Sequence, residues 1–350
     1  MSKILVVGNS IEVLTVVERI RQEDPNAPIA FFATENFLPY DRSLLPPLVG
    51  GVIKEVKLFP QALDFFKERN VEVLSSAKLA RISVKRKYLT TEDKKQISYN
   101  HLVIVDTGEL ILPDVKGHHK KGVYDALRLS SIKSLMKQIP FVDNIAVVVT
   151  NLQGLNMACA LGALKKEVLV IVSTATLVPA IFDEETGALL KQLLEAKNLR
   201  VVCESDIEEI LGDTDVKAIR LKSGKVLACE MVVFDQARLD LRMLSEDTLP
   251  QGDYIAPESN LSDLSLPISS TEFGKPLLNG FAVGTTRLLE GGREYMKFDG
   301  PQNVYSKIYL KGDALVGAVL FNSSHKYQQL EQLIADKTFV TGKEEELLSA

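Results

Sequence analysis

The sequence predicts an α/β fold with two parallel-sheet domains and a small C-terminal α+β domain. Residues 4–7 form a continuous apolar run, residues 11–22 show helical periodicity, and residues 29–32 form a second apolar run. The same order returns at residues 145–149, 154–166 and 168–172. Continuous apolar strands that alternate with amphipathic helices are typical of parallel sheets covered on both faces. Two such βαβ units about 140 residues apart indicate two Rossmann-like domains.

Shorter strands with turn signals surround these units. The first group is expected to form a meander from residues 80–84, 87–91 and 97–104. A second meander is expected from residues 216–221, 225–228 and 231–234. Residues 244–276 are rich in Ser, Pro, Asp and Gly, and this composition favours loop or short strand.

The C-terminal region shows a hairpin signal. Residues 305–310 and 314–321 flank Lys311-Gly312-Asp313, which predicts two strands joined by a tight turn. Residues 327–336 are predicted to be helical, and residues 342–350 are expected to be frayed.

Composition indicates a soluble globular protein and excludes several function classes. The chain has 350 residues and a formal net charge of -5, which argues against a nucleic-acid surface. No apolar run reaches the ~18 residues typical of a membrane span. The chain enters a strand almost at once, so we expect no signal peptide and a cytoplasmic location. The densest basic cluster, residues 118–121, is expected to be a solvated loop.

Cysteine and histidine spacing predicts neither a redox disulfide nor a metal site. The three cysteines, Cys159, Cys203 and Cys229, are far apart, and each lies in an apolar stretch. Buried structural thiols are therefore the expected role. The four histidines show no metal-ligand spacing.

Both βαβ units lack most of the glycines of a dinucleotide-binding turn. Such a turn reads G-x-G-x-x-G, because the backbone approaches the pyrophosphate and the helix packs closely on the strand. At residues 8–13 only the first glycine, Gly8, is present, and at residues 149–154 only the last, Gly154. The fold pattern is thus intact, whereas the ligand pattern is damaged.

The order of elements resembles the FAD-dependent pyridine nucleotide-disulfide reductase superfamily, over roughly residues 3–338. It is most similar to the branch of NADH:rubredoxin reductases and the flavin portion of NADH-dependent nitrite reductases. Residues 37–46, 181–187 and 305–321 carry the resemblance. The resemblance implies FAD in the N-terminal and late segments and NAD(P)H in the middle domain. That branch lacks a redox-active cysteine pair, as does this chain.

The resemblance also implies domain boundaries. Two Rossmann-like domains of the three-layer ββα type are expected, the FAD-binding-like one discontinuous, with a reductase-type α+β domain and a tail behind them. The FAD-binding-like domain is expected over residues 1–112 and 237–292, and the NAD(P)-binding-like domain over residues 113–236. The reductase-type α+β domain is expected over residues 293–340, and the tail over residues 341–350.

Three residues of the N-terminal segment match FAD contacts of the family. Gly8 matches the first glycine, Glu35 the acid that binds the adenosine ribose, and Arg42 the arginine near the flavin or pyrophosphate. The alternatives are a solvated loop carboxylate for Glu35 and a surface ion pair for Arg42, with Asp41 or Glu35. Because no acid–base constellation is evident, Tyr40, Asp41 and Arg42 are expected to position a ligand or to form plain surface loop.

Two later turns resemble FAD contacts but are altered. Thr107 and Gly108 match the family's A-T-G turn, with Asp106 in place of alanine. Gly284 and Thr285 match the strand end that reads Gly-Asp in the family. A threonine hydroxyl cannot replace both carboxylate oxygens of that aspartate.

The NAD(P)H side is more altered. Gly154 is the only remaining glycine of its turn, residues 172–174 lack the ribose-binding acid, and residues 235–237 replace the closing turn. Together these changes predict loss of NAD(P)H binding. FAD binding stays open, and the Cys and His spacing gives no reason to expect a metal.

Three functions follow as hypotheses. The first is a degenerate reductase-like protein, either non-catalytic or FAD-only, within a larger electron-transfer assembly or a homodimer. The second is an active FAD-dependent NAD(P)H oxidoreductase that passes electrons to a protein or small acceptor. The third is a ligand sensor that uses a vacated Rossmann cleft.

Overall fold

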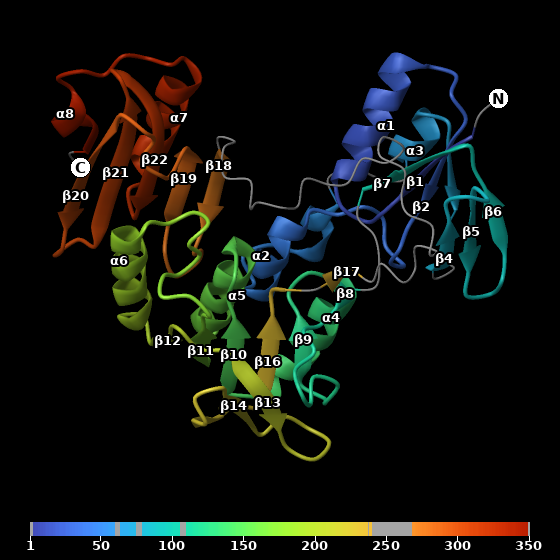
Figure 1. The fold of residues 1–350 in the computed structure, drawn as a ribbon, viewed down its shortest axis with the longest axis horizontal. Coiled ribbons are helices and arrows are strands. Elements are labelled where there is room, and N and C mark those ends of the chain that lie inside the picture. Colours follow the sequence, from blue (N-terminus) through green and yellow to red (C-terminus); the bar gives the residue numbers. More distant parts are fainter. Residues whose placement is uncertain are drawn as a thin grey trace.

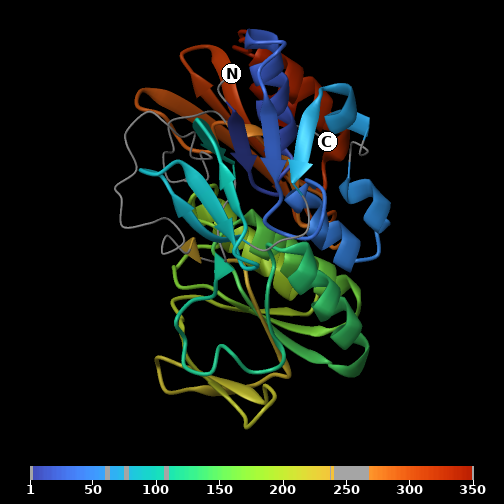
Figure 2. The same cartoon turned by 90° about the vertical axis from the view of Figure 1, so that its right-hand side faces the viewer.

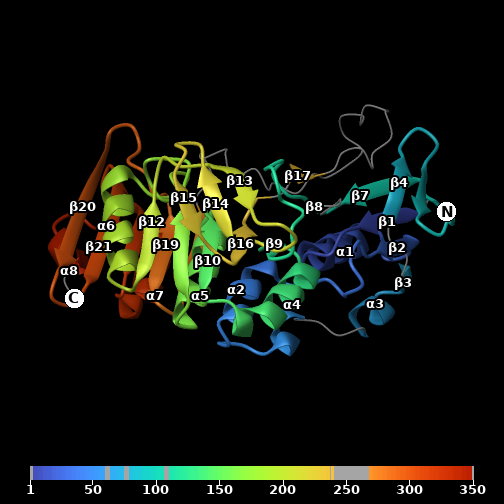
Figure 3. The same ribbon diagram turned by 90° about the horizontal axis from the view of Figure 1, so that it is seen from below.

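A computed structural model describes residues 3–59, 64–74, 79–105, 110–236, 238–239 and 268–348 (Figure 1). Two parallel sheets and one antiparallel sheet form the framework. The first parallel sheet and the antiparallel sheet lie at opposite ends of the molecule, with the second parallel sheet between them (Figures 1 and 3). No helix in these described ranges is long and apolar enough to cross a membrane.

The first sheet is parallel, in the order β3-β2-β1-β7. Its apolar strands are covered by α1 and α3 on one side and by a small antiparallel meander, β4-β5-β6, on the other (Figure 2). The bounds are β1 (Ile4–Val7), α1 (Glu12–Glu23), β2 (Ile29–Phe32), α3 (Asp64–Glu68), β3 (Val71–Leu74), β4 (Leu79–Ser83), β5 (Tyr88–Thr91), β6 (Gln96–Ser98) and β7 (His101–Ile104).

The prediction of one strand over residues 97–104 was wrong. That run is two strands, β6 in the meander and β7 in the parallel sheet. Asn100 turns the chain between them, since its backbone N–H donates to the Lys3 carbonyl (2.8 Å) and its side chain accepts from the Lys3 N–H (2.7 Å). A continuous apolar run does not reveal a change of sheet.

The second sheet is also parallel, in the order β12-β11-β10-β16-β9. The predicted second meander exists in part, as β13-β14-β15, but residues 231–234 belong to the parallel sheet. The bounds are β9 (Val123–Asp125), α4 (Leu129–Gln138), β10 (Asn144–Val148), α5 (Leu152–Ala163), β11 (Glu167–Ile171), α6 (Glu184–Glu195), β12 (Leu199–Val202), β13 (Ile207–Leu211), β14 (Ala218–Leu221), β15 (Val226–Ala228) and β16 (Met231–Phe234). A short pair joins β8 (Leu110–Ile111) to β17 (Arg238–Leu239).

The third sheet is antiparallel, in the order β18-β19-β22-β21-β20. The predicted hairpin around Gly312 is confirmed, and Gly312 has a φ of 60°. The expected frayed tail is instead a short helix, α8, because Leu347 and Leu348 are buried against the sheet. The bounds are β18 (Ile268–Phe273), β19 (Gly280–Gly284), β20 (Gly292–Asp299), β21 (Val304–Lys311), β22 (Ala314–Phe321), α7 (Tyr327–Ala335) and α8 (Glu344–Leu348).

A segment from the first domain packs onto the second. It contains the short turns η1 (Arg42–Leu44) and η2 (Glu55–Leu58) on either side of α2 (Leu45–Val49), which lies against α5 (Figure 1). Tyr40, Leu45 and Leu58 are fully buried in the same cluster as the core of the second sheet. The two domains therefore share one hydrophobic core at this point.

Candidate functional site

The first glycine turn joins β1 to α1. Gly8 is buried, with a φ of 152°, and its N–H donates to the Phe32 carbonyl across the carboxyl end of the sheet (3.1 Å). Val13, in place of the third glycine, lies in the first turn of α1 and is fully buried. No side chain caps the N-terminus of α1. The N–H groups of Val13 and Leu14 at this helix start donate to the carbonyls of Ser10 (3.1 Å) and Ile11 (2.9 Å).

Asn9 fills the carboxyl edge of the first sheet. Its buried side chain accepts from the Glu35 N–H (2.7 Å) and the Thr34 hydroxyl (3.0 Å), and donates to the Phe37 carbonyl (2.8 Å). The Asn9 carbonyl accepts from the Tyr40 N–H (2.9 Å). Sequence reasoning missed this residue, although a long amide side chain directly after Gly8 was a signal.

Glu35 connects the two domains. Its carboxylate accepts from the Tyr40 hydroxyl (2.5 Å) and from the Ser130 hydroxyl (3.2 Å) at the start of α4. A solvated loop carboxylate is therefore not what the structure shows, and the ribose role stays a prediction. A carboxylate has about four lone-pair sites, so these partners leave Glu35 capacity to accept a further hydrogen bond.

Tyr40 completes this connection. Its ring is fully buried, and its hydroxyl accepts from the Leu129 N–H (2.9 Å), the first of α4. Burial and the neighbouring Glu35 carboxylate raise the pKa of Tyr40 far above its ordinary value. The first N–H groups of a helix have no acceptor within the helix. Tyr40 and Glu35 accept from such groups and thus cap α4, although they lie about 90 residues away in the sequence.

Arg42 lies beside this network. It is half-buried and begins η1, whose start is capped by the Asp41 carboxylate through the Ser43 N–H (2.9 Å). The Arg42 carbonyl accepts from the Gln153 amide (2.8 Å), which also donates to the Ala126 carbonyl (3.1 Å). Arg42 therefore lies at the junction of the two domains.

Of the four remaining predicted FAD residues, the structure describes two. Thr107 and Gly108, with Asp106, lie outside the described residues. Gly284 ends β19 and Thr285 follows it, and β19 pairs with β18 and β22 in the antiparallel sheet.

β19, which falls in the expected range 237–292, is thus a strand of the antiparallel sheet. A short apolar strand that ends in glycine fits either kind of sheet. Gly284, with a φ of 65°, is needed because a Cβ there would lie 2.2 Å from the Val316 carbonyl oxygen. The Thr285 hydroxyl donates to the Arg287 carbonyl (3.2 Å).

The second glycine turn is filled by side chains of the chain itself. Asn151 caps α5, since its side chain accepts from the N–H groups of Gln153 (2.8 Å) and Gly154 (3.2 Å). Asp235, at the end of β16, accepts from the N–H groups of Thr150 (2.6 Å) and Asn151 (3.0 Å). It also accepts from the Thr150 hydroxyl (2.8 Å). Four backbone donors of this helix start are thereby satisfied.

The Asp235 carboxylate is tightly enclosed. The residue is 1% exposed, and burial raises its pKa to about 6. A Cβ added to Gly154 would lie 2.2 Å from Asp235 Oδ2, so this glycine makes room for the carboxylate. Sequence reasoning noted residue 235 only as a changed closing turn and did not foresee its partners.

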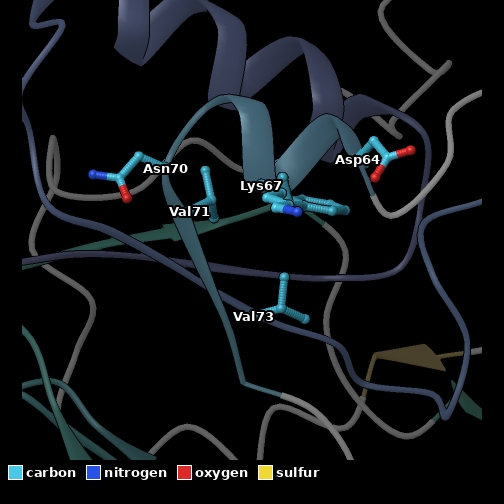
Figure 4. Close-up of a pocket in the computed structure, with 6 residues that line it drawn as sticks. Asp64, Lys67, Asn70, Val71 and Val73 are labelled. Atoms are coloured by element: carbon cyan, nitrogen blue, oxygen red, sulfur yellow. The ribbon is translucent and has the colours of Figure 1, made fainter.

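Other features add no binding site at this junction. Cys159 and Cys229 are buried and Cys203 is half-buried, all as free thiols. In the ranges that the structure describes, no group of His, Cys, Asp or Glu could hold a metal ion. A hollow of about 450 Å³ lies beside α3 and β3, and no predicted site residue lines it (Figure 4). Its walls are Asp64, Phe66, Lys67, Asn70, Val71 and Val73.

Comparisons with known proteins agree with this architecture. The chain is 24% identical to "Nitrite reductase [NAD(P)H]" of Bacillus subtilis, over 95% of the chain and 47% of that protein. It is 24% identical to "Assimilatory nitrate reductase electron transfer subunit" of the same organism, over 66% of the chain and 30% of that protein. The chain thus spans about half, or less, of these curated relatives.

A solved structure and a family profile extend the comparison. The ferredoxin reductase for the CYP199A2 system of Rhodopseudomonas palustris superposes with a TM-score of 0.78 at 17% identity, over 97% of this chain and 96% of that one. The profile of the pyridine nucleotide-disulphide oxidoreductases matches residues 2–237. With two Rossmann-like domains, a C-terminal α+β domain and this match, the chain belongs to the pyridine nucleotide-disulphide oxidoreductase family.

Proposed function

We propose that this chain is an electron-transfer protein of the reductase family whose second domain does not use NAD(P)H. It acts as a non-catalytic or FAD-only subunit of a redox assembly. The observation that carries the proposal is Asp235, whose carboxylate occupies the anion-binding turn of the second domain.

The turn that would bind a pyrophosphate already holds an anion. The N–H groups of Thr150 and Asn151 both donate to Asp235, and those of Gln153 and Gly154 donate to Asn151. A phosphate brought to this turn meets a buried carboxylate. Two unit charges about 4 Å apart repel by about 4 kcal/mol at an effective dielectric constant of 20. The residues present therefore do not fit the pyrophosphate of NAD(P)H.

The first domain differs in one respect. No side chain caps the N-terminus of α1, although the N–H groups of Val13 and Leu14 donate to the Ser10 and Ile11 carbonyls, and Gly8 lets the chain turn there. Glu35 would accept from the ribose through the lone pairs that its bonds to Tyr40 and Ser130 leave. FAD, when bound, would supply the redox chemistry, whereas Gly8, Glu35 and Arg42 would hold and orient it.

The names of the relatives support a redox role. They include a nitrite reductase, a nitrate reductase electron transfer subunit and a ferredoxin reductase. A partner protein that exchanges electrons with a bound flavin fits this proposal. An active NAD(P)H oxidoreductase is the alternative, and it requires that the second turn be open.

Titration with NADH and NADPH tests the proposal. We expect the wild-type protein to bind neither nucleotide up to ~1 mM, the upper end of ordinary KM values. The variant Asp235→Gly should gain affinity of at least about tenfold, because it frees two N–H donors and removes a charge. The matched variant Asp213→Gly, at an exposed turn, should behave as wild type.

A visible spectrum after addition of FAD and desalting completes the test. Retained flavin bands identify a FAD-only subunit, and a colourless protein identifies a non-catalytic one. Reduction of bound flavin by NADH or NADPH in the wild-type protein refutes the proposal.

A further inference from the structure

A loop of the first domain is held by hydrogen-bond donors of the second domain. The loop spans residues 35–42 and carries Glu35 and Arg42, two of the residues predicted to contact FAD. The donors are the Leu129 N–H, the Ser130 hydroxyl and the Gln153 amide, and the acceptors are the Tyr40 hydroxyl, the Glu35 carboxylate and the Arg42 carbonyl. The second domain therefore takes part in shaping this loop.

The Gln153 amide has one possible orientation at this point. Its nitrogen donates to the Arg42 carbonyl (2.8 Å) and to the Ala126 carbonyl (3.1 Å). A backbone carbonyl only accepts, so the amide nitrogen, and not the amide oxygen, has to face both groups. A side chain without a donor would lose both hydrogen bonds, and a carboxylate would also place lone pairs against the two carbonyl oxygens.

Gln153 is fixed from the side of the second domain. It lies in the first turn of α5, where its own N–H donates to the Asn151 side chain (2.8 Å). Ala126, its second acceptor, is fully buried, and the Ala126 N–H donates to the Phe234 carbonyl at the end of β16 (2.8 Å). The amide therefore starts from a fixed helix end and contacts a fixed loop, so that it can hold the Arg42 backbone in place.

The Arg42 carbonyl accepts two hydrogen bonds with different effects. The Leu45 N–H closes the turn η1 locally, whereas Gln153 attaches this turn to the second domain. The guanidinium group of an arginine is planar and can bind a phosphate through two parallel hydrogen bonds. Such a contact depends on the point from which the side chain starts, and a backbone fixed in advance lowers the entropy that binding costs.

We propose that Gln153 is a positioning residue for FAD: from the turn that would otherwise face NAD(P)H, it fixes the backbone of Arg42, whose guanidinium group contacts the bound flavin nucleotide. The inference rests on the proposed function in its FAD-only form. It adds that the second domain contributes to the affinity of the first domain for FAD, although its own turn is closed by Asp235.

Titration of the flavin-free full chain with FAD, followed by flavin fluorescence, tests this role. Gln153→Glu keeps the size of the side chain but replaces the donor with a carboxylate, so FAD should bind about tenfold more weakly. Gln192→Glu is the matched control, because Gln192 is exposed on α6 and the same change in charge should leave the affinity for FAD unchanged. Equal affinities of these two variants would overturn the inference.

A double variant separates positioning from a general loss of structure. Because Gln153 acts through Arg42, the double variant should bind FAD within about twofold of Arg42→Ala alone. Single effects that multiply in full would show two independent contributions and would overturn the role of Gln153. The visible circular dichroism of bound FAD provides a spectroscopic signature, which should change alike in Gln153→Glu and Arg42→Ala and stay as in the wild type in Gln192→Glu.

Urea unfolding of the flavin-free variants identifies a variant that does not fold. In that case Gln153→Met replaces Gln153→Glu, since it removes the donor without adding a charge, and it should still weaken FAD binding at least about threefold. A wild-type protein that binds no FAD would overturn the inference and leave the exclusion of NAD(P)H by Asp235 standing. Binding of NAD(P)H by a chain whose affinity for FAD depends on Gln153 would instead refute the proposed function alone.

Discussion

Replacing Asp235 with asparagine removes one ionisable group from the second turn and keeps the size of the side chain. The carboxylate is buried, and burial raises its pKa to about 6 from an ordinary value of 3.8. Because the pKa is raised in the folded protein, the folded state binds the proton more tightly than the unfolded state. Asp235 therefore costs stability at high pH, and that cost falls as the pH drops through 6.

The magnitude follows from the two pKa values. The full change in the free energy of unfolding is about 3 kcal/mol, since each pKa unit corresponds to 1.36 kcal/mol. It is reached only at a pH below the pKa that Asp235 has in the unfolded chain. Between pH 8 and pH 5 the expected part is about 1.4 kcal/mol, because at pH 5 the folded group is about nine-tenths protonated and the unfolded group is mostly ionised.

Urea unfolding followed by circular dichroism measures this effect. The free energy of unfolding of the wild-type protein minus that of Asp235→Asn should rise by about 1.4 kcal/mol from pH 8 to pH 5. All other titrating groups are common to both proteins, so the difference isolates Asp235. A difference that is constant with pH, or that falls towards pH 5, would refute the view that the turn encloses a poorly solvated carboxylate.

Three further substitutions test the packing around the site, each by urea unfolding at neutral pH. Gly154→Ala should lower the free energy of unfolding by about 2–3 kcal/mol, because the added Cβ would overlap the Asp235 carboxylate. Gly300→Ala is the control and should be nearly neutral, since no atom lies closer than 3.7 Å to the added Cβ. Equal effects of the two substitutions would contradict this geometry. Lys307→Met should cost about 3 kcal/mol, because the ammonium group contacts three carboxylates from a buried position. The exposed Lys311→Met should change little, and a matching loss there would count against a specific role for the buried lysine. Tyr40→Phe should cost about 1–3 kcal/mol, because it leaves a buried helix N–H and a carboxylate without the hydroxyl between them; an unchanged midpoint would disprove that connection.

Much of the fold could be predicted from the sequence, because it depends on local pattern. The apolar runs at residues 4–7 and 145–149 are strands of two parallel sheets, and the helices after them begin within two residues of the predicted positions. Gly312 specifies the hairpin between β21 and β22 because a tight turn needs its positive φ. Periodicity and turn chemistry act over a few residues, so one chain suffices to show them.

The sheet to which a strand belongs could not be predicted in this way. Residues 97–104 and residues 280–284 have apolar patterns that suit a parallel or an antiparallel neighbour equally well. Their partners are decided by segments far away, β1 for β7 and β22 for β19. This choice depends on which surfaces remain to be covered, which no local pattern contains.

The sequence by itself determined that both glycine turns are damaged, because missing glycines are visible residue by residue. Only the tertiary structure decided what fills them. Asp235 reaches the second turn because β16 pairs with β10, which brings it beside Thr150 across 85 positions of sequence. Tyr40 and Glu35 likewise meet α4 only because α2 packs on the second domain. Filling a turn needs a polar side chain at the right point in space, and long-range strand pairing and core packing alone set that point.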